Sequence, residues 1–280
     1  MNSKELIVST SPHIKTSETI SKIVGWVIIA LMPLTLMSFY LYGFLALKVI
    51  LLSVLSAVIT EAAVQKMRRF PITITDGTAV LTGLLLALTL PPNISWWLPV
   101  IGGFIAITLG KQLFGGFGYN VFNPALVARA TLLLSWTVQM TSAGWVSPLG
   151  KLDGVSGATP LALMKQAQAG TAHLTPHLYV KPLFLANPGG CIGEVSALLI
   201  LVGAAILFWR KIISWHIPFS YIGTVAIFSY IFKMDVVFNL LAGGLLLGAF
   251  FMATDYVTSP ITDKAKLVYG FGCGFMTILL

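Results

Sequence analysis

The chain has 280 residues, of which 57% are hydrophobic and only 9% are charged, and its formal net charge is +8 at pH 7. Soluble domains carry about a quarter charged residues, so this composition excludes a soluble globular fold. The 17 Lys and Arg residues collect at the ends of apolar runs instead of forming one patch. That distribution argues against nucleic-acid binding and is typical of a protein that faces membrane lipid.

The apolar runs predict an all-α, polytopic transmembrane protein with about nine to ten spans, since a helix needs about 20 apolar residues to cross a bilayer. In chain order, the runs cover residues 23–42, 44–64, 78–90, 96–113, 121–140, 192–209, 217–232, 236–253 and 267–280. The last run is too short to cross as a straight helix. We therefore expect the native chain to continue beyond Leu280.

The runs divide the chain into a cytoplasmic tail (residues 1–22), a first transmembrane half (23–140), an external loop (141–190) and a second transmembrane half (191–280). Lys and Arg are more numerous on the side of the N-terminal tail, which the positive-inside rule places in the cytoplasm. We therefore expect a multi-pass protein of a prokaryotic cell (inner) membrane, with the long loop on the outer face. The inner side would hold Lys4, Lys15, Lys22, Lys66, Arg68, Arg69, Lys111, Arg210, Lys211, Lys264 and Lys266.

Weak internal symmetry links the two halves. Residues 75–78 (TDGT) precede a short apolar run that ends at Pro91-Pro92, and residues 254–260 (TDYVTSP) precede another Gly-rich run. Short segments interrupted by Gly or Pro in corresponding halves indicate an inverted repeat whose broken helices meet near the membrane midplane. Ordinary turns between helices are the alternative.

The external loop contains a polar string, residues 153–159 (DGVSGAT). It resembles the D-G-x-(S/T)-G-A-T motif read by transferases that join the phosphate of FMN to a threonine hydroxyl. Glycine gives the backbone freedom, and the small Ala158 leaves the Thr159 hydroxyl accessible. We predict covalent FMN on Thr159, with Asp153, Ser156, Gly157 and Ala158 as its neighbours in the motif. The alternative is a turn, which uses the same residue types.

Ionisable residues within apolar segments are costly and therefore candidates for function. Glu61 lies late in the second run, where pairing with Lys66 or Arg68 at the interface is the structural alternative. Asp76 and Asp255 stand at the mouths of the predicted broken helices, where each either caps a helix or coordinates or relays a cation. The candidates for an ion pathway are Glu61, Asp76, Asp235 and Asp255.

Arg129 lies well inside the fifth run, where its guanidinium suits a phosphate, a flavin carbonyl or a buried carboxylate. Asn120 and Asn123 lie in the turn before it, and we expect all three residues to line a cofactor pocket. No metal site is expected. The chain has two cysteines and no C-x-x-C, so it cannot by itself hold a four-thiolate iron–sulfur cluster.

Several motifs together resemble one family in order and spacing, over nearly the whole chain. They are residues 11–13 (SPH), 76–79 (DGTA), 120–126 (NVFNPAL), 156–159 (SGAT), 193–196 (GEVS), 252–255 (MATD) and 258–260 (TSP). The family is that of RnfD, a membrane subunit of the Rnf complex, with the homologous NqrB subunit of the sodium-pumping NADH:quinone oxidoreductase as near neighbour. NqrB has a longer polar N-terminal segment, so RnfD fits better.

The resemblance implies a membrane-embedded subunit of an ion-translocating oxidoreductase that couples electron transfer from ferredoxin to NAD with sodium or proton export. It implies FMN on Thr159 and partner subunits: the flavoprotein RnfG, the membrane proteins RnfA and RnfE, and the soluble proteins RnfB and RnfC. Riboflavin is associated with the NqrB-type relative, and the residues here do not decide whether this chain binds it. A secondary transporter or channel without a redox role is the alternative, and a purely structural membrane scaffold is a third reading.

Overall fold

The computed structural model describes residues 18–141, 176–185 and 189–279. These residues form helices and connecting loops, with no strand among them. The first half contains α1 (Ile20–Tyr42), α2 (Phe44–Met67), the 3₁₀ turn η1 (Ile74–Asp76), α3 (Thr78–Leu88), α4 (Trp97–Ile107), the π-helix η2 (Thr108–Gln112), α5 (Pro124–Ser135) and α6 (Thr137–Thr141). The second contains α8 (Pro176–Leu185), the 3₁₀ turn η4 (Ile192–Glu194), α9 (Ala197–Trp209), α10 (His216–Ile231), α11 (Val236–Leu241), α12 (Leu245–Leu247), the π-helix η5 (Gly248–Met252) and α13 (Asp263–Leu279).

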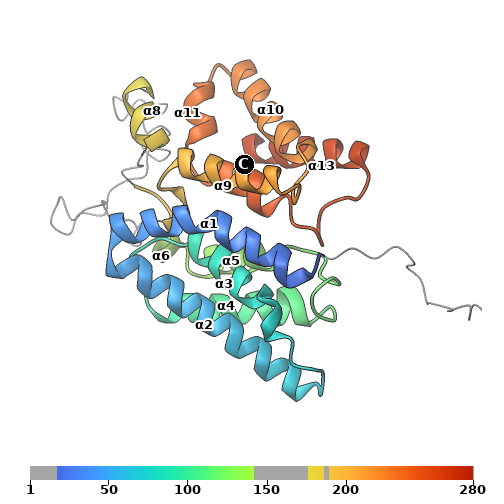
Figure 1. Ribbon diagram of the computed structural model, residues 1–280. Coiled ribbons are helices and arrows are strands. Elements are labelled where there is room, and N and C mark those ends of the chain that lie inside the picture. The colour runs from blue at the N-terminus through green and yellow to red at the C-terminus, as the bar shows by residue number, and fades with distance from the viewer. Residues whose placement is uncertain (1–17, 142–175, 186–188, 280) are drawn as a thin grey trace, which may run out of the picture.

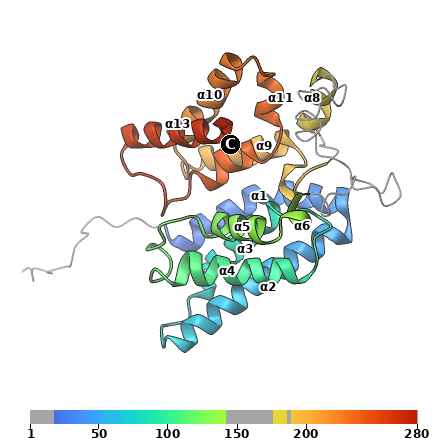
Figure 2. The ribbon, with the colours of Figure 1, turned by 180° about the vertical axis from the view of Figure 1, so that it is seen from behind.

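The helices lie in two stacked groups. Figures 1 and 2 show α1–α6 in one group and α9–α13 in the other, with α1 and α9 facing each other where the groups meet. Leucines from both groups fill the core, among them Leu31, Leu34, Leu86 and Leu207, each at most 1% exposed. Many large apolar side chains elsewhere are exposed, for example Leu134 at 83%. An apolar core beneath an apolar surface is what a lipid-facing helical protein requires.

The two longest helices, α1 and α2, are the two described helices that are long and apolar enough to cross a membrane alone. One residue joins them, Gly43, whose φ of 57° is a conformation that glycine adopts without strain. Gly43 therefore permits the tight hairpin between α1 and α2 that Figure 1 shows. The predicted runs 23–42 and 44–64 are confirmed, and the structure extends them to Ile20 and Met67.

The other predicted runs are shorter or interrupted. Run 96–113 becomes α4 followed by η2, run 236–253 divides into α11, α12 and η5, and run 121–140 breaks at Trp136 between α5 and α6. The helices α3, α5, α9 and α10 are apolar but only 10–17 residues long. Within the described residues, several of the predicted spans are therefore broken into shorter helices and are not continuous.

The broken segments meet inside the protein. The chain after α3 lies against the segment before α9: the Ile192 amide donates to the Leu90 carbonyl at 3.0 Å, and Ser38 of α1 donates to the Ile192 carbonyl at 2.6 Å. Leu90 and Ile192 are fully buried. Backbone that leaves a helix within apolar surroundings must find such partners. The sequence pattern pairs the α3 region with residues 254–260, whereas in the structure the C-terminal end of α3 meets residues 190–195.

The two helix groups contact each other through a glycine. Gly203 of α9 leaves so little room that an added Cβ would lie 2.4 Å from the Ala30 carbonyl oxygen of α1 and 2.9 Å from Phe251. Small residues at such positions let membrane helices approach closely. This glycine therefore sets the distance between α1 and α9.

We predict that Gly203→Ala destabilises the protein by about 1–3 kcal/mol, because the new methyl group collides with backbone. Gly223→Ala in α10 is the matched control, since no atom of the part of the chain that the structure describes lies within 4 Å of its Cβ position. The control should be neutral or stabilising by about 0.5–1 kcal/mol. Thermal unfolding of the detergent-purified protein measures both, and equal midpoints for the two variants would contradict the prediction.

Candidate functional site

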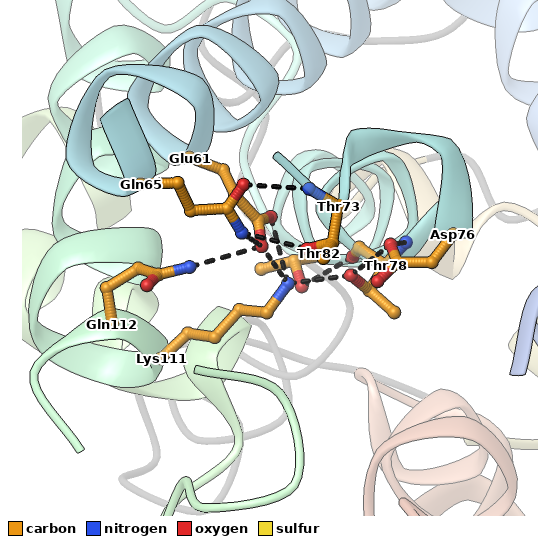
Figure 3. A network of polar contacts seen from close by, with 8 residues as sticks. All are labelled: Glu61, Gln65, Thr73, Asp76, Thr78, Thr82, Lys111 and Gln112. Carbon is orange, nitrogen blue, oxygen red and sulfur yellow. Dashed lines mark hydrogen bonds and ion pairs between the residues drawn. The ribbon is translucent and has the colours of Figure 1, made fainter. Parts of the chain in front are cut away.

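A buried ion pair lies between α2 and η2. The Nζ atom of Lys111 is 2.7 and 2.9 Å from the two carboxylate oxygens of Glu61, and the side chains are 2% and 1% exposed. Lys111 also donates to Thr78 Oγ1 at 2.7 Å, so all three of its N–H groups have oxygen partners. Figure 3 shows these side chains converging from α2, η2 and the start of α3. Buried charges persist when they are paired and hydrogen-bonded in this way.

Two amides complete the surroundings of Glu61. Gln65, one turn further along α2, and Gln112, next to Lys111, each donate to Glu61 Oε1 at 3.2 Å. Gln65 also bonds to Thr73 through both its amide atoms, at 2.8 and 3.0 Å. These bonds hold the loop before η1 against α2, as Figure 3 shows. The carboxylate is therefore held in place by three side chains, one from α2 and two from η2.

Asp76 joins this network through Thr78. Its Oδ1 accepts from the Thr78 amide at 2.9 Å and from the Thr78 hydroxyl at 2.7 Å. Gly77, with φ of 76°, turns the chain between them. The Thr78 hydroxyl thus donates to Asp76 while it accepts from Lys111. We name the group Glu61, Lys111, Thr78 and Asp76 the charge cluster; with all three ionisable members charged, it carries one net negative charge.

The charge cluster borders a small cavity of about 50 Å³ whose walls include Lys111, Thr78, Asn120, Asn123 and Asp255. A larger cavity of about 170 Å³ shares Asn123 and Asp255 with it and is otherwise lined mainly by apolar side chains of α1, α3 and the segment around η5. Three of the four predicted ion-pathway residues therefore lie at or next to one pair of cavities. Packing explains part of this, because Gly110 approaches Pro124 so closely that an added Cβ would lie 2.7 Å from its Cα.

Local bonds fix the residues on the far wall of these cavities. Asn123 caps α5, since its Oδ1 accepts from the Ala125 amide at 3.0 Å, and its Nδ2 donates to the Met252 carbonyl at 3.4 Å. Asn120 is buried and donates to the Phe122 carbonyl at 3.2 Å. Asp255, in the loop after η5, accepts from the Thr258 hydroxyl at 3.1 Å.

Two predicted site residues lie elsewhere. Arg129 lines a separate cleft of about 730 Å³ near α10 and α13, and its Nη2 atom lies 3.9 Å from Cys191 Sγ. The structure therefore does not place it at the small cavity with Asn120 and Asn123. Asp235 caps α11, because its Oδ1 accepts from the Phe238 amide at 2.9 Å. A local structural contact thus accounts for Asp235.

The predicted flavin residues Asp153, Ser156, Gly157, Ala158 and Thr159 lie outside the described residues. They stay predictions from the sequence.

Sequence reasoning missed the partner of Glu61. The alternative of Lys66 or Arg68 is wrong, because the partner is Lys111; Arg68 instead donates to the Gln112 carbonyl. The sequence places Lys111 among the charges of the inner surface, whereas the structure buries it. An acid inside an apolar run requires a cationic partner, and the position of Glu61 in such a run was therefore a usable signal in the sequence. The sequence could not identify Lys111 as that partner, because Lys111 lies 50 residues away in the chain.

Nearly the whole chain is similar in sequence to one protein family. The family model for NQR2, RnfD and RnfE matches residues 7–280. The chain belongs to this family. The motif resemblance inferred from the sequence is thereby confirmed, and membership makes this RnfD-like chain a membrane protein.

Individual relatives match over almost the same extent, and each is named as the D component of its complex. That of the Na(+)-translocating ferredoxin:NAD(+) oxidoreductase complex of Acetobacterium woodii is 46% identical over 280 residues, which cover 100% of this chain and 86% of that protein. That of the proton-translocating ferredoxin:NAD(+) oxidoreductase complex of Clostridium ljungdahlii is 44% identical, covering 98% and 85%. That of an ion-translocating oxidoreductase complex of Stutzerimonas stutzeri is 40% identical, covering 94% and 83%.

We predict that Thr78→Val destabilises the protein by about 1–3 kcal/mol, because Lys111 loses one acceptor and Asp76 one donor inside the protein. Thr82→Val is the matched control. It lies one turn further along α3 at the same cavity, but among the described residues its hydroxyl bonds only to the Thr78 carbonyl of its own helix. The control should cost less than about 1 kcal/mol. Urea or thermal unfolding distinguishes the two, and a control as unstable as Thr78→Val would count against a special role for the Thr78 hydroxyl.

Proposed function

We propose that this chain is the flavin-carrying membrane subunit of an ion-translocating ferredoxin:NAD oxidoreductase complex, with FMN joined to Thr159 by a phosphoester. The observation that carries this proposal is the match over essentially the full chain to RnfD-type proteins whose names state that activity, at 46% and 44% identity. The DGVSGAT string at residues 153–159 is the second support, and it comes from the sequence alone.

The chemistry of the loop suits attachment. Thr159 supplies the oxygen that bonds to phosphorus, Gly154 and Gly157 leave the backbone free to enter an attaching enzyme, and Ala158 keeps the hydroxyl accessible. When bound, FMN supplies the electron-transfer chemistry, while the protein holds the flavin and adjusts its surroundings. We infer that the loop faces the outer side of a prokaryotic inner membrane and that the N-terminus is cytoplasmic, as the distribution of Lys and Arg favours.

The residues that line the larger cavity suit a second flavin. Its apolar walls and its polar end at Asn123 and Asp255 suit a planar ring with one apolar and one polar edge, such as the ring of riboflavin. Its volume of about 170 Å³ is below the roughly 300–1,000 Å³ of most ligand sites. Binding there requires the walls to move apart. Arg129, which borders the separate cleft, would not contribute to this site.

The ion and the partners are drawn from the family. One relative is named for sodium and one for protons, at nearly equal identity, so similarity alone does not choose the ion. We propose that the exposed apolar faces of the helices are shared between lipid and the membrane subunits RnfA and RnfE, and that the complex also contains the flavoprotein RnfG and the soluble subunits RnfB and RnfC. Glu61, Asp76 and Asp255, gathered around the two cavities, are the residues of this chain best placed to handle the ion.

We predict that Thr159→Ala abolishes covalent flavin, because no other atom replaces the hydroxyl oxygen. Denatured wild-type protein, expressed with the attaching enzyme, should give a fluorescent flavin band on a gel, and the variant none. Thr171→Ala, in the same loop but outside the motif, is the control and should keep the band. Intact mass should show the same difference. A wild-type chain without flavin would refute the electron-carrier role and favour a transporter or scaffold.

A further inference from the structure

The Lys111 ammonium lies among oxygen atoms inside the protein. Its Nζ atom has three oxygen neighbours, the two Glu61 carboxylate oxygens at 2.7 and 2.9 Å and the Thr78 hydroxyl at 2.7 Å. Hard cations in proteins take just such oxygen ligands. A second carboxylate, Asp76, stands behind the Thr78 hydroxyl at 2.7 Å. Glu61 is 1% exposed, so this oxygen set lies within the protein and is shaped by it.

A cavity leads to the residues of the ion pair. Lys111 and Thr78 both form part of the wall of the 50 Å³ cavity, which is large enough for a few water molecules. Asp255 lines the same cavity and also the larger one beside it. A cation attracted by Asp255 would therefore be separated from the Glu61 ion pair only by this small cavity.

Lys111 also has the means to move. It lies on the π-helix η2, and single π-helical turns inside helices are frequent at functional sites, where backbone bonding can shift. The ring of Phe117, 5.8 Å from Nζ, lines both cavities and offers the ammonium a cation–π contact on the cavity side. Departure of Lys111 alone would leave Glu61 as an uncompensated buried charge, which is strongly unfavourable. Lys111 can therefore leave only as another cation arrives.

We propose that Lys111 is a tethered cation occupying a sodium site formed by Glu61 and Thr78, and that a sodium ion and the Lys111 ammonium alternate as the partner of Glu61. This exchange presupposes the ion-translocating role proposed above. One positive charge faces Glu61 in both states, so neither state contains an unpaired buried carboxylate. The displaced ammonium stays in a cavity that also contains the carboxylate of Asp255.

The test is to remove the tethered cation. In the purified complex, Lys111→Met should leave the oxygen set available, so sodium chloride should raise the thermal midpoint relative to choline chloride at equal ionic strength. Binding to the folded state predicts a rise on the order of 2–5 °C per tenfold excess of sodium over its Kd. The wild type should show a smaller sodium-specific rise than Lys111→Met, because sodium must first displace Lys111 from the oxygen set.

Two variants serve as controls. Glu61→Gln/Lys111→Met removes both charges, so it should fold without sodium and show no sodium-specific rise. Lys266→Met breaks an exposed ion pair with Asp263, 3.2 Å long, and should respond to sodium only as the wild type does. If Lys111→Met does not assemble, the double variant still decides: in proteoliposomes its sodium uptake per electron transferred should fall at least fivefold.

Three outcomes would overturn the proposal. One is a Lys111→Met protein that acid stabilises but sodium does not, since Glu61 would then merely take up a proton. Another is an equal response to sodium and choline. The last is a double variant with the wild-type ratio of sodium to electrons. Failure of the proposed function is separate: a wild-type complex without flavin or electron transfer would refute that role, while the sodium response of Lys111→Met would still report on the site.

Discussion

The ion pair between Glu61 and Lys111 is the constraint around which the first half of the protein is arranged. A charged side chain cannot be left alone in apolar surroundings, so α2, η2 and the start of α3 must meet at one point. Gln65 and Gln112 satisfy Glu61 from two sides, and Thr78 occupies the third N–H of Lys111. The pair thus fixes the relative position of segments that hydrophobic contact alone, which lacks direction, would leave free to slide.

The broken helices follow from the same requirement. A helix satisfies its own backbone, so a continuous span offers no polar atoms to a cavity. The turn at Gly77, the π-helix η2 and the loop between η5 and α13 interrupt this pattern, and they border the two cavities. Both π-helices follow a Gly-Gly pair, Gly102-Gly103 and Gly243-Gly244. That recurrence agrees with internal symmetry, although the segments that meet at the centre are α3 and residues 190–195.

The sequence predicted what depends on local composition and missed what depends on distant contacts. Apolar runs located α1 and α2 closely, because length and hydropathy suffice for a continuous span. They could not show that run 96–113 changes to a π-helix at Thr108, or that Gly110 within it packs closely against Pro124, because that contact is between different helices. Glu61, Asp76 and Asp255 stood out as costly charges. Lys111, at the end of an apolar run, looked like an ordinary surface cation, and Asp235 looked like a buried acid until its role as a cap was visible.

The charge cluster gives this membrane protein a buried set of charges at which a cation can act. The net charge of Glu61, Lys111 and Asp76 is negative by one when all are ionised, and Asp255 adds a second acid at the neighbouring cavity. Lys111 lowers the affinity of these residues for a cation, because it competes for the same oxygen atoms. A binding site already filled by its own lysine keeps the free-energy difference between its two states small, and a small difference is one that electron transfer elsewhere in a complex can reverse.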